Sequence, residues 1–173
     1  MSYAIRQLQA SDLELYRALR LEALEGHPEA FASSAEDFVR KSDATVRQML
    51  ESLSVYGAVL DDKSLGGMVA FMRAEPGKEY HRGWLLQVYV QPAHRGSGMA
   101  EALMRHAIAH VPEGVLQLHL GVWSENEPAL RLYKRLGFEI YGTEPRYLFV
   151  NGRYIDEHLM VRFLDKAPGE EHD

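Results

Sequence analysis

Several features are missing from this sequence, and each absence narrows the chemistry open to it. The chain of 173 residues contains no cysteine, which excludes a disulfide framework, a thiolate zinc site and an acyl group carried on a protein thiol. Lysine and arginine number 19 against 25 acidic residues, a net charge of −6, so no basic excess indicates a nucleic-acid partner. The absence of cysteine also fits a reducing compartment, and we expect a cytoplasmic protein.

Long apolar runs are missing as well. No stretch approaches the ~20 apolar residues that a membrane helix needs, and the first residues lack the charged-then-apolar order of a signal peptide. We therefore expect a soluble protein with no membrane partner. With 46% hydrophobic residues the chain has material for one core, which predicts a single domain over residues 1–165. Residues 166–173, which include Pro168, Gly169 and several acids, are expected to form a flexible acidic tail.

The hydrophobic pattern changes period several times, which indicates alternating strands and helices. Strands are predicted over residues 3–8, 55–60, 67–73, 83–90 and 115–123, and another begins at Phe138. Helices are predicted from Ser11 to about Gly26, over 44–53, over 97–110 and from about 126 to 137. Ser11 is the expected cap of the first helix. The strands 55–60 and 67–73 are expected to form a hairpin because a short polar turn separates them.

The segment from Val88 to Ala100 joins a buried strand to an amphipathic helix through a turn that contains glycine. Gly96 and Gly98 lack Cβ atoms, so backbone N–H groups there can approach a ligand closely. Unsatisfied N–H groups at a helix start favour anions, and Arg95 adds a positive charge beside them. The turn therefore indicates a pyrophosphate site, with a plain glycine turn that begins a helix as the alternative. Its spacing differs from the dinucleotide and P-loop patterns.

A second motif begins the helix predicted near residue 126. Pro128 suits the first turn of a helix, Ser124 or Asn126 can cap it, and Gly137 can end it. Tyr133 falls on the apolar face of this helix. Taken singly, Asn126 is well explained as a cap and Tyr133 as a core aromatic residue.

Taken together, the two motifs resemble the GNAT superfamily of acetyl-CoA-dependent N-acetyltransferases. Residues 95–100, Arg-Gly-Ser-Gly-Met-Ala, match its acyl-CoA signature Arg/Gln-x-x-Gly-x-Gly/Ala. Residues 126–138 match its second motif, Asn-x-x-Ala-x-x-x-Tyr-x-x-x-Gly-Phe. The resemblance covers nearly the whole chain and implies an α/β fold of the α+β type. In that fold a mixed, mostly antiparallel central sheet is splayed at a V-shaped acyl-CoA cleft, with helices on both faces.

The resemblance also implies which residues meet acetyl-CoA, the expected co-substrate. Main-chain groups of Val88 and Val90 would pair with the pantetheine arm, and Asn126 would touch the same arm. Tyr133 would direct its hydroxyl at the thioester sulfur, and the Val90 N–H would hold the carbonyl oxygen. The pyrophosphate would lie on the backbone N–H groups of Arg95, Gly96, Ser97, Gly98, Met99 and Ala100.

The expected reaction is direct transfer of an acetyl group to a primary amine of a small molecule in a ternary complex. Tyr133 is the candidate acid for the departing thiolate, because a phenol with a pKa of ~10 is protonated at neutral pH. The group that deprotonates the amine is left open, since residues 84–88 contain no carboxylate. The candidates are Glu75, Glu79, His81 and His119. The eight histidines lack ligand spacing, so no metal is predicted.

The acceptor is less well defined. Residues 146–154 are typical of a hairpin with an Asn-Gly turn, and Tyr154, Asp156 and Glu157 beyond it either shape the acceptor side or form a solvated strand face. A protein or peptide acceptor, and an acyl-CoA-binding module without catalysis, are the alternatives to a small-molecule acetyltransferase. A homodimer formed through the C-terminal strands is expected from the resemblance.

Overall fold

The computed structural model describes residues 2–166, which form a mixed sheet together with five α-helices and short 3₁₀ turns. The strands are β1 (Tyr3–Gln7), β2 (Ser54–Leu60), β3 (Leu65–Arg73), β4 (Arg82–Val90), β5 (Gln117–Trp123), β6 (Glu139–Val150) and β7 (Arg153–Phe163). The helices are α1 (Leu13–Gly26), α2 (Ala35–Val39), α3 (Asp43–Ser52), α4 (Met99–Ala109) and α5 (Glu127–Arg135). The 3₁₀ turns are η1 (Ala10–Asp12), η2 (Pro28–Ala30) and η3 (Pro92–His94).

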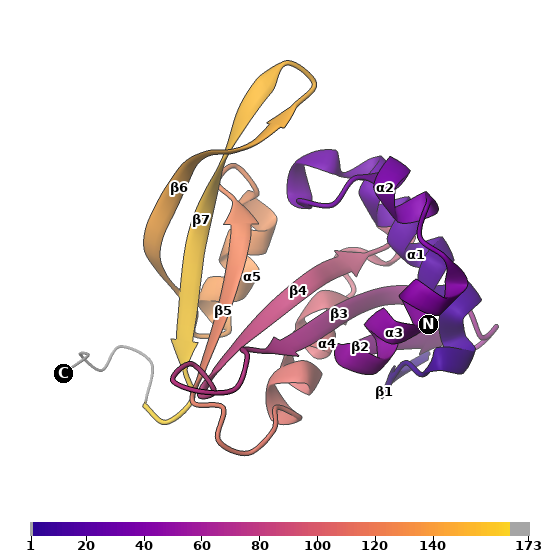
Figure 1. The fold of residues 1–173 in the computed structure, drawn as a ribbon, viewed down its shortest axis with the longest axis horizontal. Helices are drawn as coiled ribbons and strands as arrows, with labels where there is room; N and C mark the ends of the chain where they lie inside the picture. Colours follow the sequence, from indigo (N-terminus) through magenta and orange to yellow (C-terminus); the bar gives the residue numbers. More distant parts are fainter. Residues whose placement is uncertain (1, 167–173) are drawn as a thin grey trace. The chain divides into compact units, whose positions relative to one another are not determined.

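The strands follow the order β1-β2-β3-β4-β5-β7-β6 in one sheet (Figure 1). The pairs β1 with β2, β2 with β3, β5 with β7 and β6 with β7 are antiparallel, whereas β4 pairs with β5 in parallel. This mixed, mostly antiparallel sheet confirms the predicted fold class. The predicted hairpin of β2 and β3 is confirmed as well. The short helix α2 was not predicted, because its five residues are too few to show a helical period.

The chain divides into two compact units, and it crosses between them after residue 72, after residue 85 inside β4, and after residue 110. The first unit contains the residues up to 72 together with 86–110, and the second contains 73–85 and the described residues from 111 onward. The single domain expected over residues 1–165 stays a prediction. The tail expected over 166–173 lies outside the described residues, except for Lys166.

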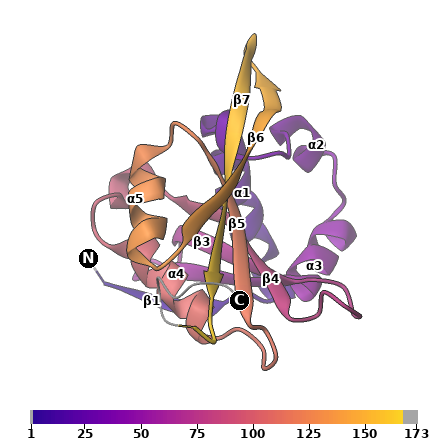
Figure 2. The same cartoon turned by 90° about the vertical axis from the view of Figure 1, so that its left-hand side faces the viewer.

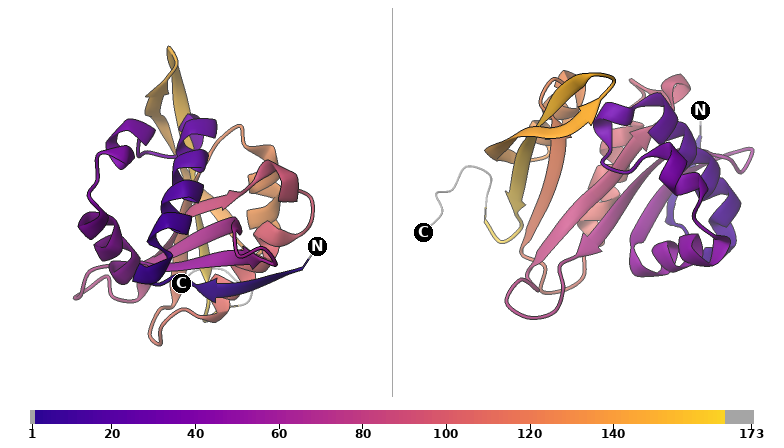
Figure 3. Two further views of the ribbon diagram at one scale, coloured as in Figure 1. Left: turned by 90° about the vertical axis from the view of Figure 1, so that its right-hand side faces the viewer. Right: turned by 45° about the horizontal axis from the view of Figure 1, so that its top comes forward.

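In the first unit, helices cover both faces of β2 and β3 because successive strand residues point to opposite faces. Val55 is fully buried in a core that includes residues of α1 and α3. The next residue, Tyr56, faces α4, where its ring centroid lies 5.0 Å from that of His106. Figure 3 shows α1 and α3 on one side of these strands and α4 on the other. None of the helices among residues 2–166 combines the length and the hydropathy that crossing a membrane requires.

The beginning of α1 differs from the prediction that Ser11 caps it. Ser11 is exposed within η1, and the residue at the cap position is Asp12. The Asp12 carboxylate turns back to accept the Gln9 N–H at 2.8 Å and pairs with Arg6 at 2.8 Å. Hydrogen bonds from Arg6 hold the pKa of Asp12 below its usual value. The 3₁₀ turn therefore shifts the cap of the helix by one residue, from Ser11 to Asp12, which the pattern of polar residues alone does not show.

In the second unit, β5 lies between the first residues of β4 and the long strand β7 (Figure 2). Residues 82–84 pair with 117–119, and the antiparallel pairing of β5 with β7 ends at Trp123 opposite Glu157. Beyond that point β7 pairs with β6, and the hairpin closes at Asn151 and Gly152. Both of these residues have positive φ, 50° and 80°, as a type I′ turn requires. The hairpin predicted from the Asn-Gly pair is confirmed.

Candidate functional site

The glycine turn of the first unit leaves its backbone open. Gly96 and Gly98 have φ values of +74° and +84°, a region that residues with a Cβ enter at a cost. A Cβ built on either glycine would have no neighbour within 4 Å. The two glycines therefore provide a sharp turn with free space on its outer side, which is what a ligand that lies against the backbone requires.

Helix α4 begins at this turn with N–H groups that precede its first helical hydrogen bond. That bond runs from the Ala102 N–H to the Gly98 carbonyl, at 3.0 Å. The N–H groups of Met99 and Ala100 come before it, and Met99 reaches only the Ser97 hydroxyl at 3.4 Å. These groups, together with the positive end of the helix dipole, fit an anion such as a pyrophosphate. The buried Met99 side chain anchors this end of the helix.

Arg95 is held close to the end of β4. Its Nε donates to the Val90 carbonyl at 3.1 Å, and its Nη2 lies 2.8 Å from Nε2 of His27. Next to it, the Ser97 hydroxyl donates to the His94 carbonyl at 2.6 Å. Arg95 therefore adds a positive charge to the turn and also ties the turn to the strand that precedes it.

The part of β4 in this unit is fixed by side chains of α1. Gln87 has a φ of +55°, unusual for a residue with a side chain, and its Oε1 accepts the Tyr16 hydroxyl at 2.9 Å. The Glu22 carboxylate accepts both the Tyr89 hydroxyl at 2.9 Å and the Gln91 amide at 2.8 Å. Burial and the adjacent Glu22 raise the pKa of Tyr89 to about 12. These bonds hold the predicted pantetheine segment of β4 against α1.

In the second unit, Asn126 is the cap of α5. Its side-chain carbonyl accepts the Ala129 N–H at 3.3 Å, Pro128 lies in the first turn, and Gly137 follows the helix with a φ of +86°. Asn126 rather than Ser124 therefore fills the cap position. The cap uses only the carbonyl oxygen of the side chain, so the role proposed for Asn126 toward the pantetheine arm falls to its amide N–H groups.

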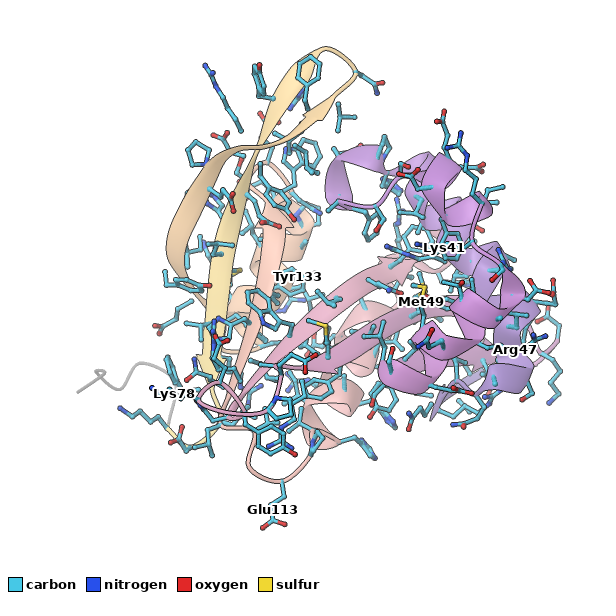
Figure 4. The ribbon with its side chains drawn as sticks, viewed as in Figure 1. Lys41, Arg47, Met49, Lys78, Glu113 and Tyr133 are labelled. Carbon is cyan, nitrogen blue, oxygen red and sulfur yellow. The ribbon has the colours of Figure 1, made fainter. Side chains whose placement is uncertain are left out.

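Tyr133, a residue of α5 that is labelled in Figure 4, is buried, with 6% of its surface exposed. Its ring centroid is 6.3 Å from that of Phe138, just beyond the helix. Burial raises the pKa of Tyr133, so the phenol remains protonated at neutral pH. The packing of Tyr133 agrees with its interpretation as a core aromatic residue. Its protonated hydroxyl agrees with its interpretation as the acid for the departing thiolate.

His119, one of the candidate bases, is buried rather than on a solvated strand face. Its ring centroid lies 5.0 Å from that of Trp84, and its Nε2 is 2.8 Å from the Gln117 amide nitrogen. Burial, followed by the charge of Arg82, lowers the pKa of His119 to about 4. The imidazole is therefore neutral at neutral pH, but it is a weak proton acceptor.

The other candidate bases lie around the start of β4. Glu79 forms an ion pair with Arg82, and its side chain is exposed. Glu75 and His81 are exposed. None of these three side chains is buried, whereas a carboxylate gains basicity through burial.

Glu157 has such an environment. It is half-buried on β7, and its carboxylate occupies the space that a side chain at Gly121 would fill. Burial, and then the charge of Glu144 opposite it in the ladder, raise the pKa of Glu157. Only the absence of a side chain at Gly121 allows this arrangement, a signal that the sequence pattern of β5 did not reveal.

The other two residues suspected on the acceptor side are engaged near the hairpin end. Asp156 accepts the Arg146 N–H at 2.8 Å, which fixes Arg146 at a φ of +54°. Tyr154 is exposed, and the Arg146 guanidinium lies 4.7 Å from its ring centroid. Among residues 2–166, no group of three or more His, Cys, Asp or Glu side chains is arranged to hold a metal ion.

Comparison with known proteins places the chain among acetyltransferases. The model of the acetyltransferase (GNAT) family matches residues 13–138. The L-amino acid N-acetyltransferase AaaT of Escherichia coli is 31% identical over 107 residues, which are 61% of this chain and 65% of AaaT. The mycothiol acetyltransferase of Brachybacterium faecium is 28% identical over 79% of this chain and 40% of its own. The match thus spans less than two thirds of either relative. Spermidine N(1)-acetyltransferase of Escherichia coli is 27% identical over 81% of this chain and 78% of its own.

Solved structures share the fold. A GNAT-family acetyltransferase from Streptococcus pneumoniae superposes with a TM-score of 0.83 at 21% identity, over 94% of this chain and 100% of that one. YncA from Salmonella typhimurium, solved with its cofactor acetyl-CoA, superposes with a TM-score of 0.77 at 21% identity, over 99% of each chain. With the family model covering well over half of its length, this chain belongs to the GNAT acetyltransferase family.

Proposed function

We propose that this protein transfers the acetyl group of acetyl-CoA to a primary amine of a small molecule. The observation that carries the proposal is the turn before α4. Two glycines with positive φ leave space on its outer side, next to N–H groups that precede the first helical hydrogen bond, and these suit an anion. This turn lies within the part of the chain that the family model matches.

In the first unit the proposed contacts with acetyl-CoA follow the order of the chain. Main-chain groups of Val88 and Val90 bind the pantetheine arm. The N–H groups of the segment from Arg95 to Ala100 bind the pyrophosphate. The Arg95 side chain also fixes the Val90 carbonyl, so a change at Arg95 disturbs both contacts.

In the second unit, Asn126 binds the pantetheine arm and Tyr133 acts on the sulfur. The amine nitrogen attacks the thioester carbonyl, a C–N bond forms, the C–S bond breaks, and the amine loses a proton as the sulfur gains one. A buried, protonated phenol suits the second transfer because its hydrogen bond strengthens as negative charge develops on sulfur. With no cysteine in the chain, transfer proceeds directly from CoA to the amine.

The amine must lose its ammonium proton before it attacks, since an alkyl ammonium has a pKa of ~10. His119, with a pKa of about 4, does not hold a proton near neutral pH. Glu157 is the better proton acceptor, because its carboxylate is half-buried and its pKa is raised. Glu157 therefore replaces the candidates suggested by the sequence.

Relatives named L-amino acid N-acetyltransferase, spermidine N(1)-acetyltransferase and mycothiol acetyltransferase support a small-molecule acceptor. A peptide acceptor, a cytoplasmic location and a homodimer stay predictions. The proposal is tested by measuring thiol release from acetyl-CoA with panels of amino acids, polyamines, other amines and peptides. Turnover with a small amine supports it. Turnover with peptides alone favours the protein acetyltransferase, and tight CoA binding with no turnover favours a binding module.

A further inference from the structure

Arg20, on α1 in the first unit, is a charged residue in an apolar environment. It is 5% exposed, and its neighbour Leu19 is 3% exposed. The centre of its guanidinium lies 4.8 Å from the ring centroid of Phe31. Helical periodicity predicts Arg20 beside the apolar face of α1 and gives no sign that its charge is buried.

The buried guanidinium has unused donors. Its Nε and Nη1 are buried and donate to no acceptor within residues 2–166. Arg17, three residues earlier, also has a buried Nε without an acceptor, but its Nη2 pairs with Asp43 at 3.1 Å. Arg6 likewise pairs with Asp12. Arg20 thus differs from Arg6 and Arg17, because its guanidinium forms no ion pair with a carboxylate within residues 2–166.

An arrangement of this kind is unfavourable for folding alone. Burying a charged group without a partner costs several kcal/mol even after the surroundings relax, on the order given by continuum estimates and mutational data. Burial lowers the pKa of Arg20, but a guanidinium remains protonated at any pH at which the protein is handled. An anion that binds here would satisfy the unused donors and remove the penalty.

The position of Arg20 relates it to the predicted acyl-CoA segment of the same unit. Arg20 follows Tyr16 by four residues, so the two side chains project from the same face of α1. The Tyr16 hydroxyl binds Gln87, the residue immediately before Val88. The Arg20 guanidinium therefore lies one helical turn from Tyr16. Tyr16 in turn contacts β4 next to Val88, where the pantetheine arm is proposed to bind.

We propose that Arg20 binds a carboxylate of the acceptor, so that the acceptors of this enzyme are amino acids or other amines that carry a carboxylate. The inference rests on the proposed acetyl transfer and narrows its substrate class. A carboxylate matches the planar donor pattern of a guanidinium and can accept two of its N–H groups at once. A polyamine would instead bring a second cation toward a buried one.

The test compares acceptors that differ only in the carboxylate: a panel of L-amino acids and the corresponding amino acid amides, with acetyl-CoA and thiol detection. The wild-type protein is expected to favour the acids over the amides in kcat/KM by roughly 10- to 150-fold, the range for hydrogen bonds to a charged group. Arg20→Met should bring this ratio close to one. Arg20→Lys should retain part of the preference because it keeps the charge.

Arg17→Met is the matched control, on the same helix and with a paired guanidinium. It is expected to lower stability through the loss of the Asp43 pair and to leave the acid-to-amide ratio unchanged. Arg20→Met should have the opposite pattern. It should unfold at the wild-type temperature or above it, because an unpaired buried charge is removed, and it should lose the preference for acids over amides. A purely structural Arg20 would show reduced stability and an unchanged ratio, which would overturn the inference.

The outcomes separate the two proposals. Turnover of amides or polyamines at rates equal to those of amino acids would contradict the role of Arg20 and leave acetyl transfer intact. Absence of thiol release with every amine tested would contradict acetyl transfer itself, and the substrate class with it. A carboxylate preference that disappears in Arg20→Met and persists in Arg17→Met would support both.

Discussion

Gly98 offers a sharp test of the acyl-CoA site, because a matched glycine exists elsewhere in the chain. Gly98 has a φ of +84° and Gly152 has a φ of +80°. At both positions a Cβ would meet nothing within 4 Å. Replacing either residue by alanine therefore introduces the same backbone strain and no clash within the protein. The two sites differ in that Gly98 precedes the N–H groups of α4 and Gly152 closes the hairpin of β6 and β7.

The expected stability change follows from the backbone alone. Left-handed conformation costs a residue with a Cβ roughly 1–2 kcal/mol. For a chain of this length each kcal/mol lowers the melting temperature by about 2–4 °C. Gly98→Ala and Gly152→Ala should thus show similar losses. In Gly98→Ala alone the methyl group projects beside the proposed pyrophosphate contact, and loss of one hydrogen bond to a charged group weakens binding by roughly 10- to 150-fold.

The assay is isothermal titration of each variant with CoA, accompanied by thermal unfolding without ligand. Gly98→Ala should lose affinity, and Gly98→Glu, which adds a negative charge, should abolish binding. Gly152→Ala should bind CoA like the wild-type protein. Equal CoA affinity of Gly98→Ala and Gly152→Ala, at equal loss of stability, would refute the placement of the pyrophosphate on this turn.

Two further predictions concern the second unit. Tyr133→Phe should reduce kcat by ~10²–10⁴-fold, the usual contribution of a positioned acid, and leave CoA affinity nearly unchanged. Steady-state kinetics measure kcat and titration calorimetry measures the affinity. An unchanged kcat would exclude Tyr133 as the acid. His119 should make the protein less stable in acid: its pKa is about 4 when folded and ~6.5 when unfolded, so the unfolded chain takes up the proton first. The contribution of the neutral His119 ring to the free energy of unfolding is therefore complete above pH ~6.5, and it is lost as the pH falls toward about 4. Urea unfolding at pH 7 and pH 5 should show a smaller difference for His119→Gln than for the wild-type protein, and an equal difference would argue against a neutral buried ring.

Sequence patterns predicted well those features that depend on neighbours along the chain. The Asn151-Gly152 pair determines the local turn, Asn126 and Pro128 determine a helix start, and Gly96 and Gly98 mark the sharp turn before α4. Each of these depends on the conformational preference of one or two residues. The placement of the strands and long helices could therefore be predicted closely.

Features that depend on distant parts of the chain were not predicted. Ser11 looks like a cap, but Asp12 takes that position because Arg6 and Gln9 supply its partners. His119 alternates with apolar residues, yet Trp84 covers it. Charged residues are normally assigned to the surface, so the burial of Arg20 could not be inferred from its neighbours in the sequence.

The position of Glu157 could not be predicted for the same reason. It depends on Gly121, which lies 36 positions earlier in the chain and faces it only when β5 pairs with β7. A glycine within a strand often marks a close approach of another group, but the sequence does not say which group approaches. The motifs therefore give a prediction of the acyl-CoA residues, and the sequence already suggests Glu157 for the acceptor side. The partial burial of Glu157 against Gly121 emerged only from the structure.

Transfer of a labelled acetyl group tests the central claim most directly. The protein is incubated with acetyl-CoA labelled in the acetyl group, first without an acceptor and then with a panel of L-amino acids, and both the protein and the small molecules are analysed by mass spectrometry. Direct transfer predicts an unlabelled protein in the first step and a labelled N-acetyl amine in the second. A labelled protein that passes its label to the amine, or the absence of any labelled amide with every acceptor, would contradict the account.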